Sequence, residues 1–186
     1  WWSPNSEIAL RRVECDSEVS IDRSWWRGKL AHAIARRAPL AAVTNACRLV
    51  HGEGDGLPAL VVDTYDRSLV VQLLSAAVEA QRGVILDVLQ ELVTPCGILA
   101  RNDASVRSRE GLSKEIELLA GAVPEEIEVD EHGVRYLAAP FPFLLSWLGT
   151  MLPFRTVAMV MCSIYLVGIV ALIWAPETKG QPLPED

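Results

Sequence analysis

The stretch that decides the fold is Thr44-Asn-Ala-Cys-Arg-Leu-Val-His-Gly-Glu-Gly-Asp-Gly-Leu-Pro-Ala-Leu-Val-Val-Asp63. It holds three glycines between residues 52 and 56, a spacing that predicts turns because glycine adopts positive φ at little steric cost. A phosphate cradle is the weaker alternative, since Glu53 and Asp55 would repel an anion. A calcium loop is also disfavoured, because the acidic spacing differs from the one such loops need. We therefore predict a structural turn that leads into a strand.

The residues around this turn predict a small sheet. Leu60–Val62 and Leu69–Leu74 are β-rich runs on either side of a polar segment, the pattern of a hairpin. Further strands are predicted at residues 6–13 and 97–100, and a second hairpin at 126–130 with 134–137.

Two helices are predicted beside these strands. Asp22 is a good N-cap for a helix that ends near Arg37, and Pro39 stops it. Ser75 can cap a second helix at about 78–93, with a buried stripe of Ile85, Val88, Leu89 and Leu92. The combined pattern predicts an α+β fold, a small sheet domain with a helix packed on one face.

The charges are divided unevenly along the chain. The formal net charge is −7, yet Arg155 is the one charged residue between positions 137 and 174. The 19 uncharged residues 156–174 have nearly the length that spans a bilayer. We therefore expect one or two transmembrane segments at 139–175, anchoring the chain in a membrane, and a polar tail at 176–186.

The cysteines predict neither a metal site nor a disulfide framework. Cys15, Cys47, Cys96 and Cys162 include no Cys-x-x-Cys pair and do not cluster. Buried structural thiols are the favoured interpretation of Cys47 and Cys96. His32, His51 and His132 are scattered, so no metal and no Ser-His-Asp constellation is predicted.

Three arginines are the candidate RNA contacts. Arg101, Arg107 and Arg109 lie on a polar stretch from which they could reach phosphates. The alternative is a solvated face with surface ion pairs, because Asp103 and Glu110 are close in sequence. The negative net charge argues against indiscriminate nucleic-acid binding but leaves room for a local basic face.

Several motifs together resemble those of the class I SAM-dependent large-subunit rRNA (cytosine-C5) methyltransferase family. The run 44–63 with Val70–Ser75 resembles the family's linker region, and Trp2–Ile8 resembles the exit from its PUA domain. The segments 97–103 and 106–112 resemble its middle-domain motif, and Glu131–Tyr136 the hairpin that precedes its catalytic domain. The resemblance covers about residues 1–138. It divides them into a remnant of the PUA domain at 1–20, a linker helix at 21–43 and an α+β middle domain at 44–138.

The resemblance implies rRNA as a partner, a cytoplasmic location and methyl transfer from S-adenosylmethionine (SAM). The sequence departs from the family after the second hairpin, where the family continues into a Rossmann domain. No strand–Gly-x-Gly–helix motif occurs in the chain. We therefore expect no catalytic or cofactor-binding residues and no bound cofactor, so that the chain is an RNA-associated module without activity of its own.

The tail has a resemblance of its own. Residues 139–186, with the apolar run and then Pro176-Glu-Thr-Lys-Gly180, resemble the carboxyl end of a major-facilitator sugar-type transporter. One or two helices cannot perform alternating access, so an anchor is the expectation there. A chimera joined near 137–141, a membrane protein of transporter descent and a non-functional fragment remain alternatives at this point.

Overall fold

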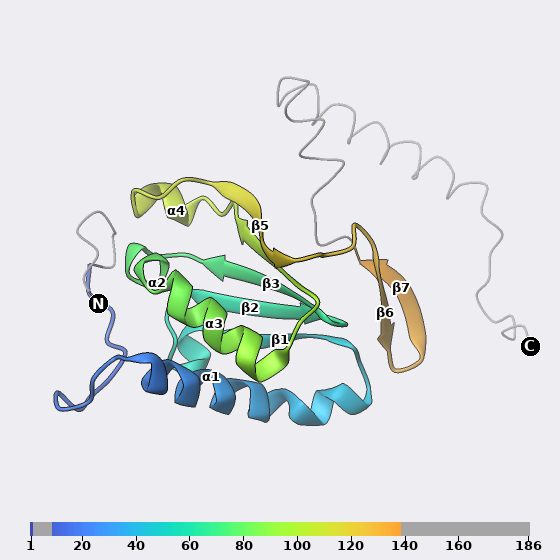
Figure 1. The fold of residues 1–186 in the computed structure, drawn as a ribbon, viewed down its shortest axis with the longest axis horizontal. Coiled ribbons are helices and arrows are strands. Elements are labelled where there is room, and N and C mark those ends of the chain that lie inside the picture. The colour runs from blue at the N-terminus through green and yellow to red at the C-terminus, as the bar shows by residue number, and fades with distance from the viewer. Residues whose placement is uncertain (2–8, 139–186) are drawn as a thin grey trace, which may run out of the picture. The chain divides into compact units, whose positions relative to one another are not determined.

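The computed structural model describes residue 1 and residues 9–138. The first helix, α1 (Arg23–Arg37), begins where the carboxylate of Asp22 accepts a hydrogen bond from the backbone N–H of Trp25. The elements that follow are η1 (Ala38–Ala42), β1 (Ala46–His51), η2 (Gly52–Asp55), β2 (Leu60–Tyr65), β3 (Ser68–Leu73), α2 (Ala76–Ala80), α3 (Arg82–Val93), β4 (Gly97–Asn102), α4 (Val106–Arg109), β5 (Glu115–Gly121), β6 (Ile127–Glu131) and β7 (Val134–Ala138) (Figure 1).

The main sheet is mixed. Its strands lie in the order β1-β2-β3-β4-β5, with β3 and β4 parallel and the other neighbours antiparallel. The parallel pair arises because α2 and α3 carry the chain from the end of β3 back to the start of β4. The predicted α+β class is therefore wrong, and the fold is α/β. A separate two-stranded sheet consists of β6 and β7.

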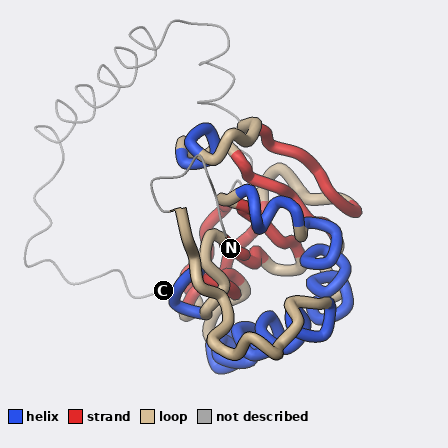
Figure 2. The backbone as a smooth tube through the Cα atoms, turned by 90° about the vertical axis from the view of Figure 1, so that its left-hand side faces the viewer, coloured by secondary structure: helices blue, strands red, loops and turns tan. Residues whose placement is uncertain are grey.

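One face of the sheet is covered by α1 and α3, which lie side by side in Figure 1. Helix α1 contributes Trp26 and Leu30 to the core, and α3 contributes Ile85, Val88 and Leu89. The strand residues that meet them in the core are Val50, Leu60, Val62, Leu69, Val71, Leu73 and Ile98. Figure 2 shows most of the helical tube on one side of the strands. Burial of each such side chain stabilises the fold by about 2 kcal/mol.

The glycine-rich stretch is a structural turn, as predicted. Gly52 has φ of 48° and Gly56 has φ of 68°, a backbone conformation that glycine adopts readily. These residues form η2 and reverse the chain between β1 and β2. Strand β1 was not predicted, because its alternation is interrupted by a register shift between Arg48 and Val50.

The other elements follow the predictions with local differences. Both predicted hairpins are confirmed, as β2–β3 and β6–β7. The single helix predicted at 78–93 is two helices, α2 and α3, separated at Gln81. Strand β5 was not predicted, and in the described part of the segment 6–13, which is residues 9–13, there is no named strand.

The predicted transmembrane segments at 139–175 and the polar tail lie outside the described residues. Within residues 9–138, no helix has both the length and the apolar character that crossing a bilayer would require.

Candidate nucleic-acid interface

The sheet face turned away from α1 and α3 carries a polar and aromatic set. Side chains alternate along each strand, so the register assigns them to faces. Two rows of paired residues run across the sheet on this side. One row is Arg48, Asp63, Val70 and Leu99, from β1 to β4. The other is His51, Val61 and Gln72, from β1 to β3. Alternation places five polar or aromatic side chains on this side. Together they form the polar face, which consists of Arg48, His51, Tyr65, Gln72 and Arg101.

Arg48 is held rigidly on the polar face. Its Nε donates to Asp63 Oδ1 at 2.7 Å and its Nη2 donates to Oδ2 at 3.1 Å, while Nη1 lies 3.3 Å from His51 Nδ1. The hydrogen bond that Arg48 donates to Asp63 raises the pKa of Arg48. The guanidinium is thus a fixed cation whose orientation is set before any ligand arrives.

A hollow of about 550 Å³ lies beside this arginine. Tyr65 from β2 and Tyr136 from β7 both line it, together with Arg48 and His51. Burial and a hydrogen bond to Glu131 raise the pKa of Tyr136. Aromatic rings beside a fixed guanidinium can stack on unpaired bases and contact phosphate.

The three arginines predicted to contact RNA lie in different environments. Arg101 is at the end of β4, with its Nε 3.6 Å from Asp103 and 39% of its side chain exposed. Arg109 ends α4 and is exposed. Arg107 is 1% exposed, and its guanidinium donates to Leu73 O, to Ser113 O and to Glu79. Arg107 is thus bonded to groups of the protein itself, whereas Arg101 and Arg109 are more accessible; contact of all three with phosphate stays a prediction.

Comparison with curated proteins identifies relatives of this chain. The chain is 37% identical over 139 residues to a protein from Shigella boydii named ribosomal RNA large subunit methyltransferase I, and 37% and 38% identical to proteins of that name from Aeromonas salmonicida and Erwinia tasmaniensis. The chain is therefore similar to rRNA methyltransferases. Each match covers 73% of this chain and 35% of the relative, so the chain spans about a third of the length of these proteins. No family model matches the chain.

Solved structures show the same fold. A protein from Streptococcus mutans, proposed to be a SAM-dependent methyltransferase, aligns with a TM-score of 0.55 at 18% identity, covering 71% of this chain and 32% of that chain. A proposed methyltransferase solved in complex with SAH aligns with a TM-score of 0.56 at 19% identity, covering 66% of this chain and 31% of that chain. Both agree with an α/β fold rather than the predicted α+β class. The resemblance of the tail to a transporter finds no support among these relatives.

The names of these two neighbours mention SAM in one case and SAH in the other. In this chain, the parallel strands β3 and β4 and the helices between them form a βαβ unit. The amino terminus of α2, the first helix of that unit, is occupied by groups of the chain itself. Ser75, at the amino end of α2, caps Val78, and the backbone N–H of Ala76 donates to the carboxylate of Glu110 at 3.3 Å. The side chain of Glu110 is fully buried and pairs with Arg11 at 3.2 Å. A carboxylate therefore already occupies the amino terminus of α2, which disfavours an anionic ligand at that point.

No role in the candidate interface is assigned to the cysteine thiols or to a metal ion. Burial raises the pKa of the Cys47 thiol, which disfavours the nucleophilic thiolate. Cys96 is exposed and its sulfur lies 3.4 Å from Ser68 Oγ. Among residues 1 and 9–138, no group of three or more His, Cys, Asp or Glu could hold a metal ion.

No pattern in the sequence predicted Arg48, His51 or Tyr65 as site residues. Arg48 and His51 fall in the stretch that the glycines led us to assign to turns. The signal that could have found them is the period-two pattern of β1 and β2, which the register shift at Leu49 obscures.

Proposed function

We propose that residues 9–138 form the RNA-contacting domain of an rRNA methyltransferase, with the polar face as its contact surface. The observation that carries the proposal is the guanidinium of Arg48, which Asp63 holds in place beside His51, in a hollow that Tyr65 and Tyr136 also line. The similarity of the chain to rRNA methyltransferases supports it. Arg101, on the same face, and Arg109 extend the positive charge toward α4.

The reaction of the whole protein would be methyl transfer from SAM to rRNA in the cytoplasm. The names of the relatives support rRNA as the substrate and SAM as the methyl donor. Methylation at cytosine C5 is a finer expectation that comes from the motif resemblance alone. No step of the transfer is assigned to the described residues, and the full chain is predicted to show no saturable SAM binding by calorimetry. Saturable binding would contradict that prediction without affecting the RNA proposal.

The expected RNA affinity is modest. The chain carries a net charge of −7, and both Arg48 and Arg101 have a carboxylate close by. If Arg48, Arg101 and Arg109 each neutralise one phosphate, the slope of log K against log salt is about −2 for single-stranded RNA. Stacking on Tyr65 or Tyr136 would add about 1 to 3 kcal/mol per base.

The test is fluorescence anisotropy of a labelled single-stranded fragment of large-subunit rRNA titrated with the full chain, at about 50 to 200 mM salt. Tyr65→Ala is expected to weaken binding about tenfold through lost stacking. Arg48→Ala is expected to weaken it about fivefold and to reduce the salt slope by about 0.7.

Arg23→Ala is the matched control. Arg23 also pairs with a carboxylate, at 2.6 Å from Glu91, and it has similar exposure, but it lies on α1 and not on the polar face. Its loss should leave the affinity nearly unchanged. The proposal fails if the chain shows no salt-dependent binding at low salt, or if Arg23→Ala weakens binding as much as Arg48→Ala.

A further inference from the structure

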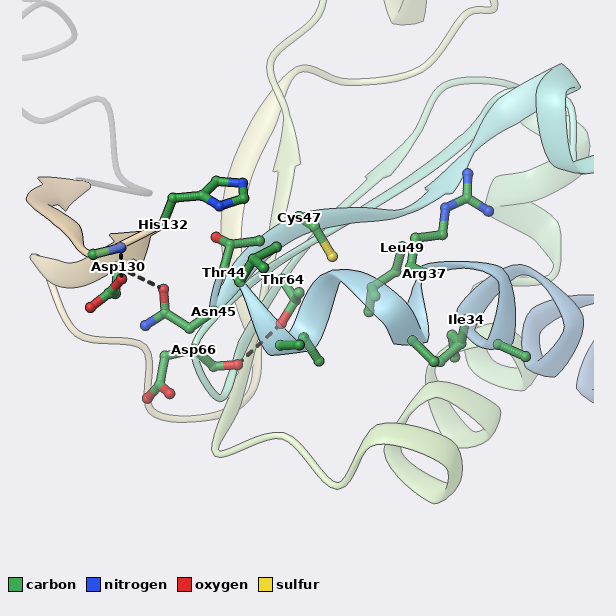
Figure 3. A pocket seen from close by; sticks show the side chains of 16 residues that line it. Ile34, Arg37, Thr44, Asn45, Cys47, Leu49, Thr64, Asp66, Asp130 and His132 are labelled. Atoms are coloured by element: carbon green, nitrogen blue, oxygen red, sulfur yellow. Dashed lines mark hydrogen bonds between the residues drawn. The ribbon is translucent and has the colours of Figure 1, made fainter.

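A second and larger hollow also borders β1, with a volume of about 810 Å³ (Figure 3). It shares Arg37, Cys47 and Thr64 with the first hollow. It is enclosed by the end of α1, by η1, by β1 and β2 and by the turn between β6 and β7. Its surface is more apolar than polar, with aliphatic side chains from Ile34, Ala35, Ala38, Ala41, Ala42, Val43 and Leu49. Such a lining suits a branched aliphatic side chain. His132 is the one aromatic ring among the lining residues, which include no Phe, Tyr or Trp.

The walls of this hollow are fixed before a ligand binds. Asn45 joins β1 to the β6–β7 hairpin, since its Nδ2 donates to Glu128 O at 3.0 Å and its Oδ1 accepts from the N–H of Asp130 at 2.9 Å. The N–H of His132 also donates to Val43 O at 2.8 Å. The hairpin therefore stands as a stable wall opposite η1, and little ordering entropy is lost when a ligand enters.

The charge of the hollow is negative. Three of its lining residues carry formal charge at neutral pH: Arg37, Asp66 and Asp130. The charge of Arg37 is matched by buried Asp55, which it contacts at 2.6 Å. Asp66 is exposed, and its carboxylate has no partner among the described residues, while Asp130 lies 3.6 Å from Arg135. Carboxylates at the rim repel a phosphate backbone and attract Lys or Arg.

Exposed apolar residues lie in the segment that forms one wall of the hollow. Leu40 in η1 and Val43, the residue after η1, are 42% and 36% exposed, although both are large aliphatic residues. Together with the aliphatic lining, they extend the apolar surface beyond the hollow. Apolar surface rimmed by polar groups marks a protein interaction site.

We propose that this hollow binds a short basic polypeptide segment. One aliphatic side chain of the segment enters the hollow against Ile34 and Leu49, and a flanking Lys or Arg pairs with Asp66. A polypeptide fits this hollow better than RNA does, because its surface is mainly apolar and the unpaired charge at the rim, on Asp66, is negative. This inference is independent of the RNA proposal, which concerns the polar face.

The probe is the labelled peptide acetyl-Lys-Arg-Leu-Ile-Arg-Lys-amide, titrated with the full chain in an anisotropy experiment. Two control peptides separate the contributions. In one, Leu and Ile are replaced by Ser, and in the other, the basic residues are replaced by Glu. The structure predicts that the first binds at least tenfold more weakly and that the second does not bind.

Two pairs of variants test the location. Ala41→Trp fills the hollow from an exposed position and should weaken peptide binding at least tenfold, whereas Ala80→Trp, exposed on α2, should not. Asp66→Asn keeps the positive φ of 52° tolerable, because Asn adopts it readily, and should weaken binding about threefold. Asp87→Asn removes the charge of an exposed carboxylate on α3 and should have no effect.

Equal affinities for the native chain and Ala41→Trp would overturn the proposal, and so would equal affinities for the basic-aliphatic and Ser-substituted peptides. A loss of RNA affinity in Ala41→Trp with unchanged peptide affinity would assign the hollow to RNA instead. Failure of the RNA experiment on the polar face leaves these outcomes unaffected.

Discussion

The guanidinium of Arg37 donates two parallel hydrogen bonds to the carboxylate of Asp55, at 2.6 and 2.7 Å. The same carboxylate accepts from Arg36 at 2.9 Å and from the backbone N–H of His51 at 2.7 Å. Burial raises the pKa of Asp55, but the Arg37 and His51 hydrogen bonds outweigh it and leave the pKa below its ordinary value. Asp55 thus joins the end of α1 to the glycine-rich turn and to strand β1.

Asp55→Asn is expected to lower the free energy of unfolding by about 3 kcal/mol, because it leaves the half-buried Arg37 without a charged partner. Urea unfolding followed by circular dichroism measures this change. Asp87→Asn on the exposed face of α3 is the control and should stay within about 0.5 kcal/mol of the native chain. Similar losses for both variants would show that the Arg37 contact is not what stabilises the turn.

Glu14 gives the fold a specific acid sensitivity. A hydrogen bond from Trp25 Nε1 at 3.0 Å, and another from the N–H of Cys15 at 2.8 Å, lower the pKa of Glu14 from 4.5 to about 2. Because the folded-state pKa is depressed, the stabilisation is fully present above pH 4.5 and is lost as the pH falls toward 2.

Glu14→Gln should therefore make the free energy of unfolding less dependent on pH in this window. Urea titrations at several pH values across the window compare it with Glu53→Gln, an exposed carboxylate in η2. Parallel pH curves for Glu14→Gln and the native chain would contradict the assignment.

Two glycines should respond to alanine in opposite directions. Gly28 lies within α1 with open space around its Cα, so Gly28→Ala should stabilise the fold by about 1 kcal/mol through helix propensity. Gly121 has φ of 60°, and a Cβ there would lie 2.0 Å from Cys96 O. Gly121→Ala should destabilise the fold by about 2 to 4 kcal/mol. Thermal unfolding of both variants checks the signs, and a stabilising Gly121→Ala would refute the β4–β5 geometry.

Arg107→Met is expected to lower the free energy of unfolding by about 3 kcal/mol, because two backbone carbonyls lose a buried donor and Glu79 loses its closest cation. Arg67→Met, at an exposed position, is the control. Chemical denaturation measures both. A fully stable Arg107→Met with weakened RNA binding would support the phosphate contact that the sequence suggested for this residue.

Local signals in the sequence were enough to predict several elements of the fold. The Asp22 cap, the polar turn between β2 and β3 and the glycines at 52–56 each act over a few residues, and the structure has the corresponding helix start, hairpin and reversal. Strand β1 and the break at Gln81 were not predicted, because a register shift and a single interrupted turn leave no periodic pattern.

The candidate site was less accessible from the sequence. The sequence gives no reason to distinguish Arg101, Arg107 and Arg109, which are three cations close together. In the structure, however, Arg107 is the one of the three that is buried in a hydrogen-bond network. Which arginine is buried depends on the carbonyl and carboxylate groups that lie near it in the folded chain. The spacing of residues in the sequence does not show which groups these are. The same is true of Arg48 and Tyr136, which lie in one hollow although 88 positions (136 − 48) separate them.

By itself, the sequence determined the helix caps, the turns and the likeness to rRNA methyltransferases, because these depend on residues close together in the chain. Only the tertiary structure decided that the sheet is mixed, that Glu110 fills the amino terminus of α2 and that two hollows flank β1. Those features arise where strands and loops distant in sequence are packed together, and the free energy that selects them is that of the packed core as a whole.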